Sequence, residues 1–245
     1  VAFGLKMQGV EKSEREEVEL ADRSRTTLLT AIGHDLRTPI ATIKTTVSGL
    51  RSGDVELSAL DRAESLALIE GESDRLADLL TNLLDQARLE AGALITKPAL
   101  VEVGDLLKRA RRNFPDLVVT LDDNLPLVVA DVGLVERVLA NLLGNIQRHA
   151  GEGVTAFLSV HRLSDVAALQ VVITVEDDGP GLAHDRAVSV FEPFNSAGDR
   201  SRGGSGLGMA IVRGFTEAMG GTVEARRSEH GGLAVDIKLP ARDNA

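Results

Sequence analysis

A histidine with an acidic neighbour stands on the outward face of a predicted helix. The run His34-Asp35-Leu36-Arg37-Thr38-Pro39 lies within a helical pattern. His34 falls almost opposite the apolar stripe of that helix, with Thr38 one turn later on the same face. An imidazole there is either a plain surface residue or a nucleophile, since Asp35 can hold one ring nitrogen protonated and leave the other lone pair free. Pro39 removes a backbone donor and is expected to bend the helix beside His34.

A second group of residues could recognise a nucleotide base. Asp177-Asp178-Gly179-Pro180-Gly181 directly follows a β-rich run. A carboxylate at a strand end, followed by glycines that let the backbone approach closely, can accept a hydrogen bond from the exocyclic amine of a base. The same five residues are equally typical of a tight turn, so they do not decide the function alone.

A glycine-rich segment could bind phosphate. Gly203-Gly204-Ser205-Gly206-Leu207-Gly208 opens a predicted helix, and the backbone amides of such a helix start form an anion site. Two common nucleotide sites are excluded. No lysine follows a glycine, as a P-loop requires, and Met209 stands where the dinucleotide fingerprint needs Gly or Ala.

Two asparagine side chains and one arginine side chain share one face of another predicted helix. Asn141, Asn145 and Arg148 recur at steps of four and three, so their side chains lie on one side. Amide oxygen suits Mg²⁺, which keeps several waters and also binds nucleotide phosphates. An ordinary polar helix face is the alternative for these three residues.

Two long helices should precede the residues that could bind nucleotide. The first, over 13–51, carries a stripe at steps of three and four: Leu28, Ile32, Leu36, Ile40, Ile43, Val47 and Leu50. The second carries a seam of period 3.5: Leu66, Ile69, Ser73, Leu76, Leu80, Leu83 and Ala87. Ser52-Gly53-Asp54 joins them into an antiparallel hairpin, and Gly92 ends the second. Two helices cannot bury both stripes, so we expect a homodimer with a four-helix bundle.

The second half of the chain alternates helices and strands, which predicts an α+β fold overall. The expected helices are 103–112, 132–149 and 206–219, and the expected strands are 117–121, 127–130, 155–163, 169–176, 222–227 and 233–239. The segment 177–205 is expected to be loop, with a flap at 195–205. The predicted domain organisation is an N-terminal segment 1–12, a hairpin domain 13–93, a linker 94–98 and an α+β domain 99–245.

Composition narrows the possible partners. The 245 residues contain 27 Lys and Arg against 37 Asp and Glu, a formal net charge of -10, so a nucleic acid backbone would be repelled. The chain has no cysteine, which excludes thiol catalysis and cysteine-based zinc sites. No apolar run reaches the roughly 18–20 residues of a membrane span. The chain begins at Val1 and enters a charged helix, from which we expect a fragment of a longer protein.

Taken in order, these groups resemble the boxes of the two-component sensor histidine kinases. The segment around His34 looks like the H box and Asn141 to His149 like the N box. Asp177 to Gly181 and Gly204 to Gly208 look like the two glycine boxes, and Phe191-Glu192-Pro193-Phe194 like the F box. The similarity spans about residues 13–240. The flanks of the H box and the residues before the N box look most like the Kdp-type, potassium-sensing kinases.

The resemblance implies a phosphoacceptor hairpin followed by an ATP-binding sandwich of the Bergerat type, the fold of gyrase and the Hsp90 chaperones. His34 would accept the γ-phosphoryl group of ATP, with Asp35 as its orienting base. Asn145 would ligate Mg²⁺, Asn141 and Arg148 would face phosphates, and Asp177 would read the adenine amine. The resemblance also assigns the lining of the pocket to a further set: His149, Gly179, Gly181, Phe191, Gly204, Gly206, Leu207 and Gly208. His149 stands where Tyr or Phe is common in the family, and Arg148 where Lys is common.

The same resemblance implies partners and a location. The phosphoryl group would pass to an aspartate on the receiver domain of a response regulator, and in the reverse mode Thr38 would orient a water that hydrolyses it. The fragment would be cytoplasmic, and the full-length protein would be anchored in the bacterial inner membrane by an upstream segment.

Two other functions are compatible with parts of the pattern. One is a nucleotide-binding regulator or phosphatase-only scaffold without productive transfer, and the other is an ATP-gated clamp. Asn145 and Asp177 argue against the first, because a degenerate pocket has no need of them, and the histidine-bearing hairpin argues against the second. His161, His184 and His230 are scattered and receive no role.

Overall fold

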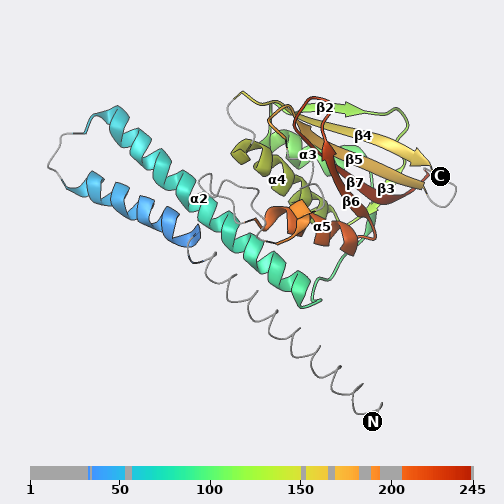
Figure 1. Cartoon of the computed structure of the whole chain (residues 1–245), viewed down its shortest axis with the longest axis horizontal. Helices are drawn as coiled ribbons and strands as arrows, with labels where there is room; N and C mark the ends of the chain where they lie inside the picture. Colours follow the sequence, from blue (N-terminus) through green and yellow to red (C-terminus); the bar gives the residue numbers. More distant parts are fainter. Residues whose placement is uncertain are drawn as a thin grey trace, which may run out of the picture. The chain divides into compact units, whose positions relative to one another are not determined.

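The chain forms two compact units, Val1–Leu79 and Leu80–Ala245. The computed structural model describes residues 33, 35–52, 57–149, 153–164, 169–181, 189–193 and 206–243 (Figure 1). Within these ranges the predicted α+β class is confirmed. The first predicted helix falls partly outside the described residues, since only its part from residue 35 onward is included.

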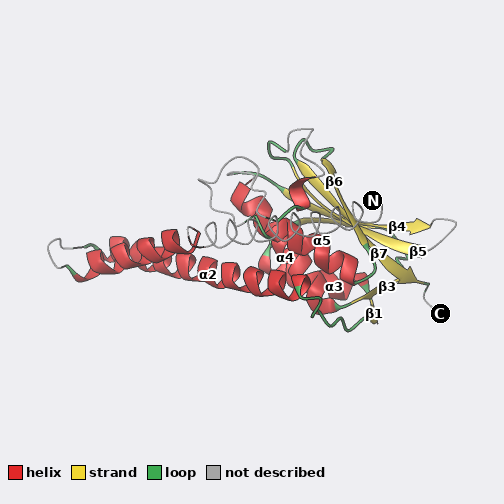
Figure 2. Cartoon of the chain, turned by 60° about the horizontal axis from the view of Figure 1, so that its bottom comes forward, coloured by secondary structure: helices red, strands yellow, loops and turns green. Residues whose placement is uncertain are grey.

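Two helices lie side by side in the N-terminal unit (Figures 1 and 2). Residues 35–51 form a helix that runs unbroken through Pro39, whose side chain is buried. Helix α2 (Ala59–Glu90) follows. Its start has a reciprocal cap, because the Ser58 N–H donates to the Asp61 carboxylate and the Asp61 N–H donates to the Ser58 hydroxyl, both at 3.1 Å. No helix among the described residues is both long and apolar enough to cross a membrane.

The apolar seam predicted on α2 is only partly covered within one chain. Ile69, Leu76 and Leu83 are half-buried, as predicted. Leu66 and Leu80 are 56% and 57% exposed, and the residue buried next to Leu80 is Leu79. The buried stripe of the single chain is therefore shifted by one residue over part of its length, which leaves a row of leucines on the surface.

A seven-stranded mixed sheet forms the framework of the C-terminal unit. Its strands are β1 (Ala99–Val101), β2 (Val118–Leu121), β3 (Leu127–Ala130), β4 (Ala156–Ser164), β5 (Leu169–Asp177), β6 (Thr222–Arg227) and β7 (Leu233–Arg242). The order is β1-β3-β7-β5-β4-β2, and β6 also pairs with β7. Strands β2 and β4 are parallel, and the other pairs are antiparallel. The sequence predicted six of these strands and missed β1.

Three helices cover one face of the sheet: α3 (Val103–Asn113), α4 (Val132–His149) and α5 (Gly208–Ala218) (Figure 2). Alternate residues of β5 and β7 point into this core, so that Val175 pairs with Val235 and Ile173 with Ile237, all of them buried. The intervening pair, Thr174 and Asp236, is hydrogen-bonded at 2.8 Å. Helix α5 begins two residues later than predicted, and the predicted loop contains a 3₁₀ turn, η2 (Ser189–Phe191).

The last turns of α2 belong to the same compact unit as the sheet. Leu83 and Leu89 pack against its core. A Cβ atom placed on Gly214 of α5 would lie 2.6 Å from a Leu89 methyl group, so glycine permits this close approach. The Arg137 guanidinium of α4 donates to the Asp85 carboxylate from Nε at 3.0 Å and from Nη2 at 2.5 Å. A charged pair therefore fixes the end of α2 to α4.

The Asp85–Arg137 pair should make a measurable contribution to stability. Arg137→Ala leaves the buried Asp85 with the more distant cation of Arg88, 3.9 Å away, so we expect the free energy of unfolding to fall by about 2–3 kcal/mol in urea titrations. Arg213→Ala is the matched control, because its ion pair with Glu217 is exposed and should change stability by less than about 0.5 kcal/mol. Equal losses of unfolding free energy in the two variants would show that the buried pair stabilises the fold no more than the exposed pair.

Candidate nucleotide-binding site

The polar face of α4 lies at the centre of the site. Asn141 is 5% exposed, and its amide N–H donates to the Arg137 carbonyl at 3.0 Å. This bond directs the other amide atom, Oδ1, away from the helix. One turn later the Arg148 guanidinium donates to Asn145 Oδ1 at 3.2 Å. The three residues predicted to share a face therefore do so, and Arg148 occupies one of the two lone pairs of Asn145 Oδ1.

The start of α5 meets this face. A Cβ atom on Gly208 would lie 3.0 Å from Asn141 Oδ1 and 3.6 Å from Asn145 Oδ1. Gly206 has φ of +65°, a conformation that favours glycine. Leu207, the residue directly before α5, is fully buried in the core. Among the described residues, the N-cap position is held by Leu207, whose side chain makes no capping hydrogen bond. The N-terminal amides of α5 and two amide oxygens of α4 thus come together, as expected of a site for phosphate and its cation.

A buried carboxylate forms the other part of the site. Asp177 ends β5 and is only 6% exposed. Burial raises the pKa of its carboxyl group above the ordinary value, and the like charges of Asp178 and Glu176 add to the rise. The backbone N–H groups of Gly179 and Leu233 donate to the carboxylate and oppose that rise, the former at 2.9 Å. A carboxylate held in this way is a strong acceptor for an amine.

The loop after Asp177 is shaped by its glycines. Gly181 has φ of +70°, and a Cβ atom there would lie 2.9 Å from the Gly232 carbonyl oxygen. The neighbouring Asp178 accepts the Thr155 N–H at 2.8 Å, which ties the loop to the start of β4. Phe191 of η2 is 7% exposed and belongs to the hydrophobic core beside α5. Its side chain therefore supports the site from within rather than lining an open pocket.

Several predicted site residues are described only in part or not at all. His34 and Gly204 lie outside the described residues, as does the side chain of His149. Asp35 is half-buried and Thr38 is exposed on the helix over 35–51. The roles predicted for these five residues, like those predicted for the other site residues, remain predictions.

Sequence reasoning missed one part of the site. The Gly232 N–H donates to the Asp177 carbonyl at 3.1 Å, and the next residue, Leu233, donates to the carboxylate. Gly232 ends the connection between β6 and β7 and Leu233 begins β7, more than 50 residues from Asp177. The pair Gly231-Gly232 was a signal of a tight turn, but nothing in the sequence linked that turn to the carboxylate.

Two family models match the two units. The model described as the His Kinase A (phospho-acceptor) domain matches residues 24–92. The model described as a histidine kinase-, DNA gyrase B- and HSP90-like ATPase matches residues 130–243. Together they cover well over half of the chain, in the order that the sequence predicted.

The chain belongs to the sensor histidine kinases. This histidine kinase is similar to the sensor protein KdpD of Mycobacterium tuberculosis, with 40% identity over 96% of this chain and 28% of the relative. KdpD of Escherichia coli K12 is 30% identical over 93% of the chain and 25% of the relative. The predicted Kdp-type resemblance is confirmed. The chain spans about a quarter of the length of these relatives.

Solved histidine kinases have the same fold. The histidine kinase AdeS of Acinetobacter baumannii matches with a TM-score of 0.62 at 23% identity, covering 86% of this chain and 98% of that one. Full-length ShkA in complex with AMPPNP matches with a TM-score of 0.60 at 27% identity, covering 89% of this chain and 46% of that one.

The residues of this histidine kinase fit a hard divalent cation. Two uncharged amide oxygens, from Asn141 and Asn145, lie beside the start of α5 at Gly208. No cluster of three or more His, Cys, Asp or Glu side chains occurs in the described part of the chain. Such a donor set suits Mg²⁺ that is held jointly by the protein, waters and phosphate oxygens.

Burial of Asp177 should reduce stability in a pH-dependent way. Because the folded state has the higher pKa, stability falls as pH rises from the unfolded pKa of about 3.9 through the folded pKa. Asp177→Asn should therefore raise the nucleotide-free melting temperature at pH 7, and this gain should shrink as the pH is lowered toward 4. Asp178→Asn, at the exposed neighbour, is the control and should show a much smaller gain. A rise in melting temperature for Asp177→Asn that does not depend on pH would contradict the conclusion that burial raises the pKa of Asp177.

Proposed function

We propose that this chain is the kinase core of a sensor kinase, which transfers the γ-phosphoryl group of ATP to His34. The observation that carries the proposal is the meeting of Asn141 and Asn145 with the start of α5 at Gly208. Side-chain amide oxygens that can ligate a cation there lie next to backbone N–H groups that can bind phosphates. Asp177, buried at the end of β5, supplies the acceptor for a base amine.

Each part of the nucleotide would have its own contact. The carboxylate of Asp177 accepts a hydrogen bond from the adenine amine, and the amides of α5 hold the phosphates. Arg148 moves from Asn145 Oδ1 to a phosphate oxygen when the nucleotide binds, which frees that amide oxygen for the cation. Mg²⁺, when bound, neutralises charge on the β- and γ-phosphates.

The chemical step would be an in-line substitution at the γ-phosphorus. A bond forms between one ring nitrogen of His34 and phosphorus, the bond to the β–γ bridging oxygen breaks, and ADP leaves. Asp35 holds the imidazole in the reactive tautomer and takes up its proton. Positioning and electrostatic stabilisation, rather than covalent chemistry by the protein, supply the rate enhancement.

We further propose that the phosphoryl group passes from His34 to an aspartate on the receiver domain of a response regulator. Transfer forms an aspartyl phosphate and restores the neutral imidazole. In the reverse mode, Thr38 positions a water that hydrolyses this aspartyl phosphate. Thr38 is exposed on the helix over 35–51, which supports this role.

A homodimer is proposed for the hairpin. Leu66, Leu80 and Leu84 are all more than half exposed in the single chain, which favours burial against a second copy in a four-helix bundle. In the whole protein, by similarity to the sensor proteins named KdpD, we propose a potassium-responsive kinase anchored in the inner membrane, with this part of the chain in the cytoplasm.

Labelling with γ-labelled ATP and Mg²⁺ tests the transfer. The wild-type chain should acquire label that is acid-labile and base-stable, as a phosphoramidate is. His34→Gln should lose it entirely, and Asn145→Ala should lose at least about 90% of the initial rate, because the cation loses its amide ligand. His161→Gln is the control, since that exposed residue pairs with Asp122 and should label normally. Label that persists in His34→Gln would refute the proposal.

A further inference from the structure

The turn between β6 and β7 lies against the end of β5, where Asp177 is found. Its backbone is closed by the Ser228 N–H, which donates to the Gly232 carbonyl at 2.9 Å, and by the Gly231 N–H, which donates to the Ser228 carbonyl at 3.1 Å. From this turn the Gly232 N–H donates to the Asp177 carbonyl at 3.1 Å. The Leu233 N–H donates to the Asp177 carboxylate. The turn and the first residue of β7 therefore contact the backbone and the side chain of Asp177, respectively.

The contact is close enough to require glycine at position 232. A Cβ atom on Gly232 would overlap the Asp177 carboxylate, and it would lie 2.7 Å from the carboxylate carbon. The requirement is one of space, since Gly232 does not have a left-handed φ. Gly181, on the loop after Asp177, also lies close to the turn, because a Cβ atom there would lie 2.9 Å from the Gly232 carbonyl oxygen and 3.2 Å from the Gly231 carbonyl oxygen.

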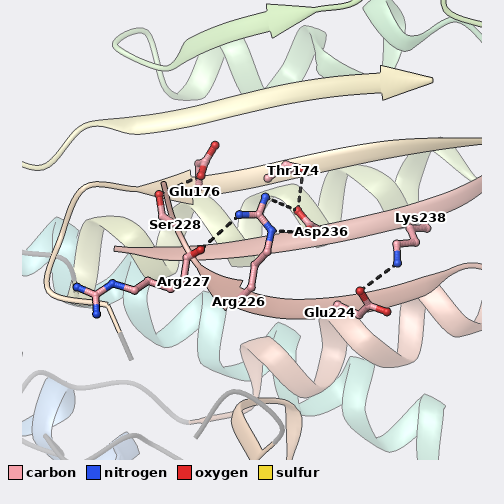
Figure 3. A network of polar contacts seen from close by, with 8 residues as sticks. All are labelled: Thr174, Glu176, Glu224, Arg226, Arg227, Ser228, Asp236 and Lys238. Atoms are coloured by element: carbon pink, nitrogen blue, oxygen red, sulfur yellow. Dashed lines mark hydrogen bonds and ion pairs between the residues drawn. The ribbon is translucent and has the colours of Figure 1, made fainter. Parts of the chain in front are cut away.

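The opposite side of the turn is anchored to β4 and β5. The Ser228 hydroxyl donates to Glu176 at 2.9 Å (Figure 3) and accepts the His230 N–H at 3.0 Å. The His230 ring stacks on Phe157, with centroids 3.9 Å apart and planes 12° apart. His230 Nε2 also lies 4.0 Å from the Glu176 carboxylate. The turn is thus fixed on both sides of Asp177, by an aromatic stack and by hydrogen bonds.

We propose that the Ser228–Gly232 turn is the positioning element for the carboxylate that reads the adenine amine. In this arrangement Gly232 sets where the Asp177 carboxylate lies, and His230 holds the turn in place through its stack on Phe157. Neither residue contacts a reacting atom, so both are positioning residues. The inference rests on the proposed function, in which Asp177 accepts the amine.

The same hairpin offers a matched control. Farther from the turn, Arg226 donates to Asp236 at 2.7 and 3.1 Å, and Lys238 pairs with Glu224 at 3.0 Å (Figure 3). Lys238 lies opposite Val172, at the other end of β5 from Asp177. Removing the Lys238–Glu224 ion pair therefore disturbs the hairpin without reaching the carboxylate.

The experiment is autophosphorylation at varied nucleotide concentration, with ATP and with inosine triphosphate, which lacks the exocyclic amine. His230→Ala should raise the KM for ATP about ten-fold with kcat unchanged, since the hydrogen bond to the amine is made equally in the ground and transition states. The KM for inosine triphosphate should change by less than about two-fold. Gly232→Ala should show the same pattern with a larger rise. Lys238→Ala should leave both KM values unchanged, and His230→Phe, which keeps a ring on Phe157, should stay near wild type.

Three outcomes would overturn the inference. The first is a wild-type KM for ATP in His230→Ala, and the second is an equal rise for both nucleotides. The third is a rise in Lys238→Ala as large as that in His230→Ala. Should Gly232→Ala fail to fold, the half-exposed His230 carries the test. In each of these cases the wild-type chain still labels from ATP, and the proposed function stands. A wild-type chain that does not label would refute both.

Discussion

The nucleotide site depends on one costly interaction, the burial of a carboxylate at the end of the central strand of the sheet. Asp177 is buried and lies next to two other acidic residues, which disfavours its charged form. Backbone N–H groups offset part of that cost. They come from the loop that follows Asp177 and from the first residue of β7, directly after the β6–β7 turn, so the positions of both are constrained. The amine of a bound base would add a further donor to the Asp177 carboxylate. Ligand binding is therefore the best explanation for the free-energy cost of burying this carboxylate.

The phosphate end of the site is built by different means. Helix α4 supplies side-chain amide oxygens from a face that is partly buried. Helix α5 supplies the backbone N–H groups of its first turn, and the buried Leu207 and Phe191 hold that turn in place. The close approach at Gly208 brings the two together. The end of α2 is fixed to the same helix α4 through Asp85 and Arg137. The Asn141 amide donates to the carbonyl of the same Arg137, so the contact with α2 and the phosphate site share one residue of α4.

Periodicity in the sequence predicted most of the fold, because each element buries one face along its length. The bounds of β3, α4 and β6 agree with the structure to the residue. Strand β1 was missed, since three residues are too few for a pattern, and it exists only because Ala99 to Val101 pair with β3. The seam of α2 was predicted in part, because a single chain does not cover Leu66 and Leu80.

The site was predicted as far as contiguous motifs reach. Asn141, Asn145, Gly208 and Asp177 lie where their motifs suggested. The roles of Gly232 and His230 could not be inferred, because they depend on the register of β4, β5 and β7, which places Phe157 opposite Glu176 and the turn beside Asp177. The most direct test of the account is calorimetric titration of the wild-type chain with ATP and with inosine triphosphate in the presence of Mg²⁺. A carboxylate that reads the amine predicts at least about ten-fold tighter binding of ATP, a difference of about 1.4 kcal/mol. Equal affinities for the two nucleotides would contradict it.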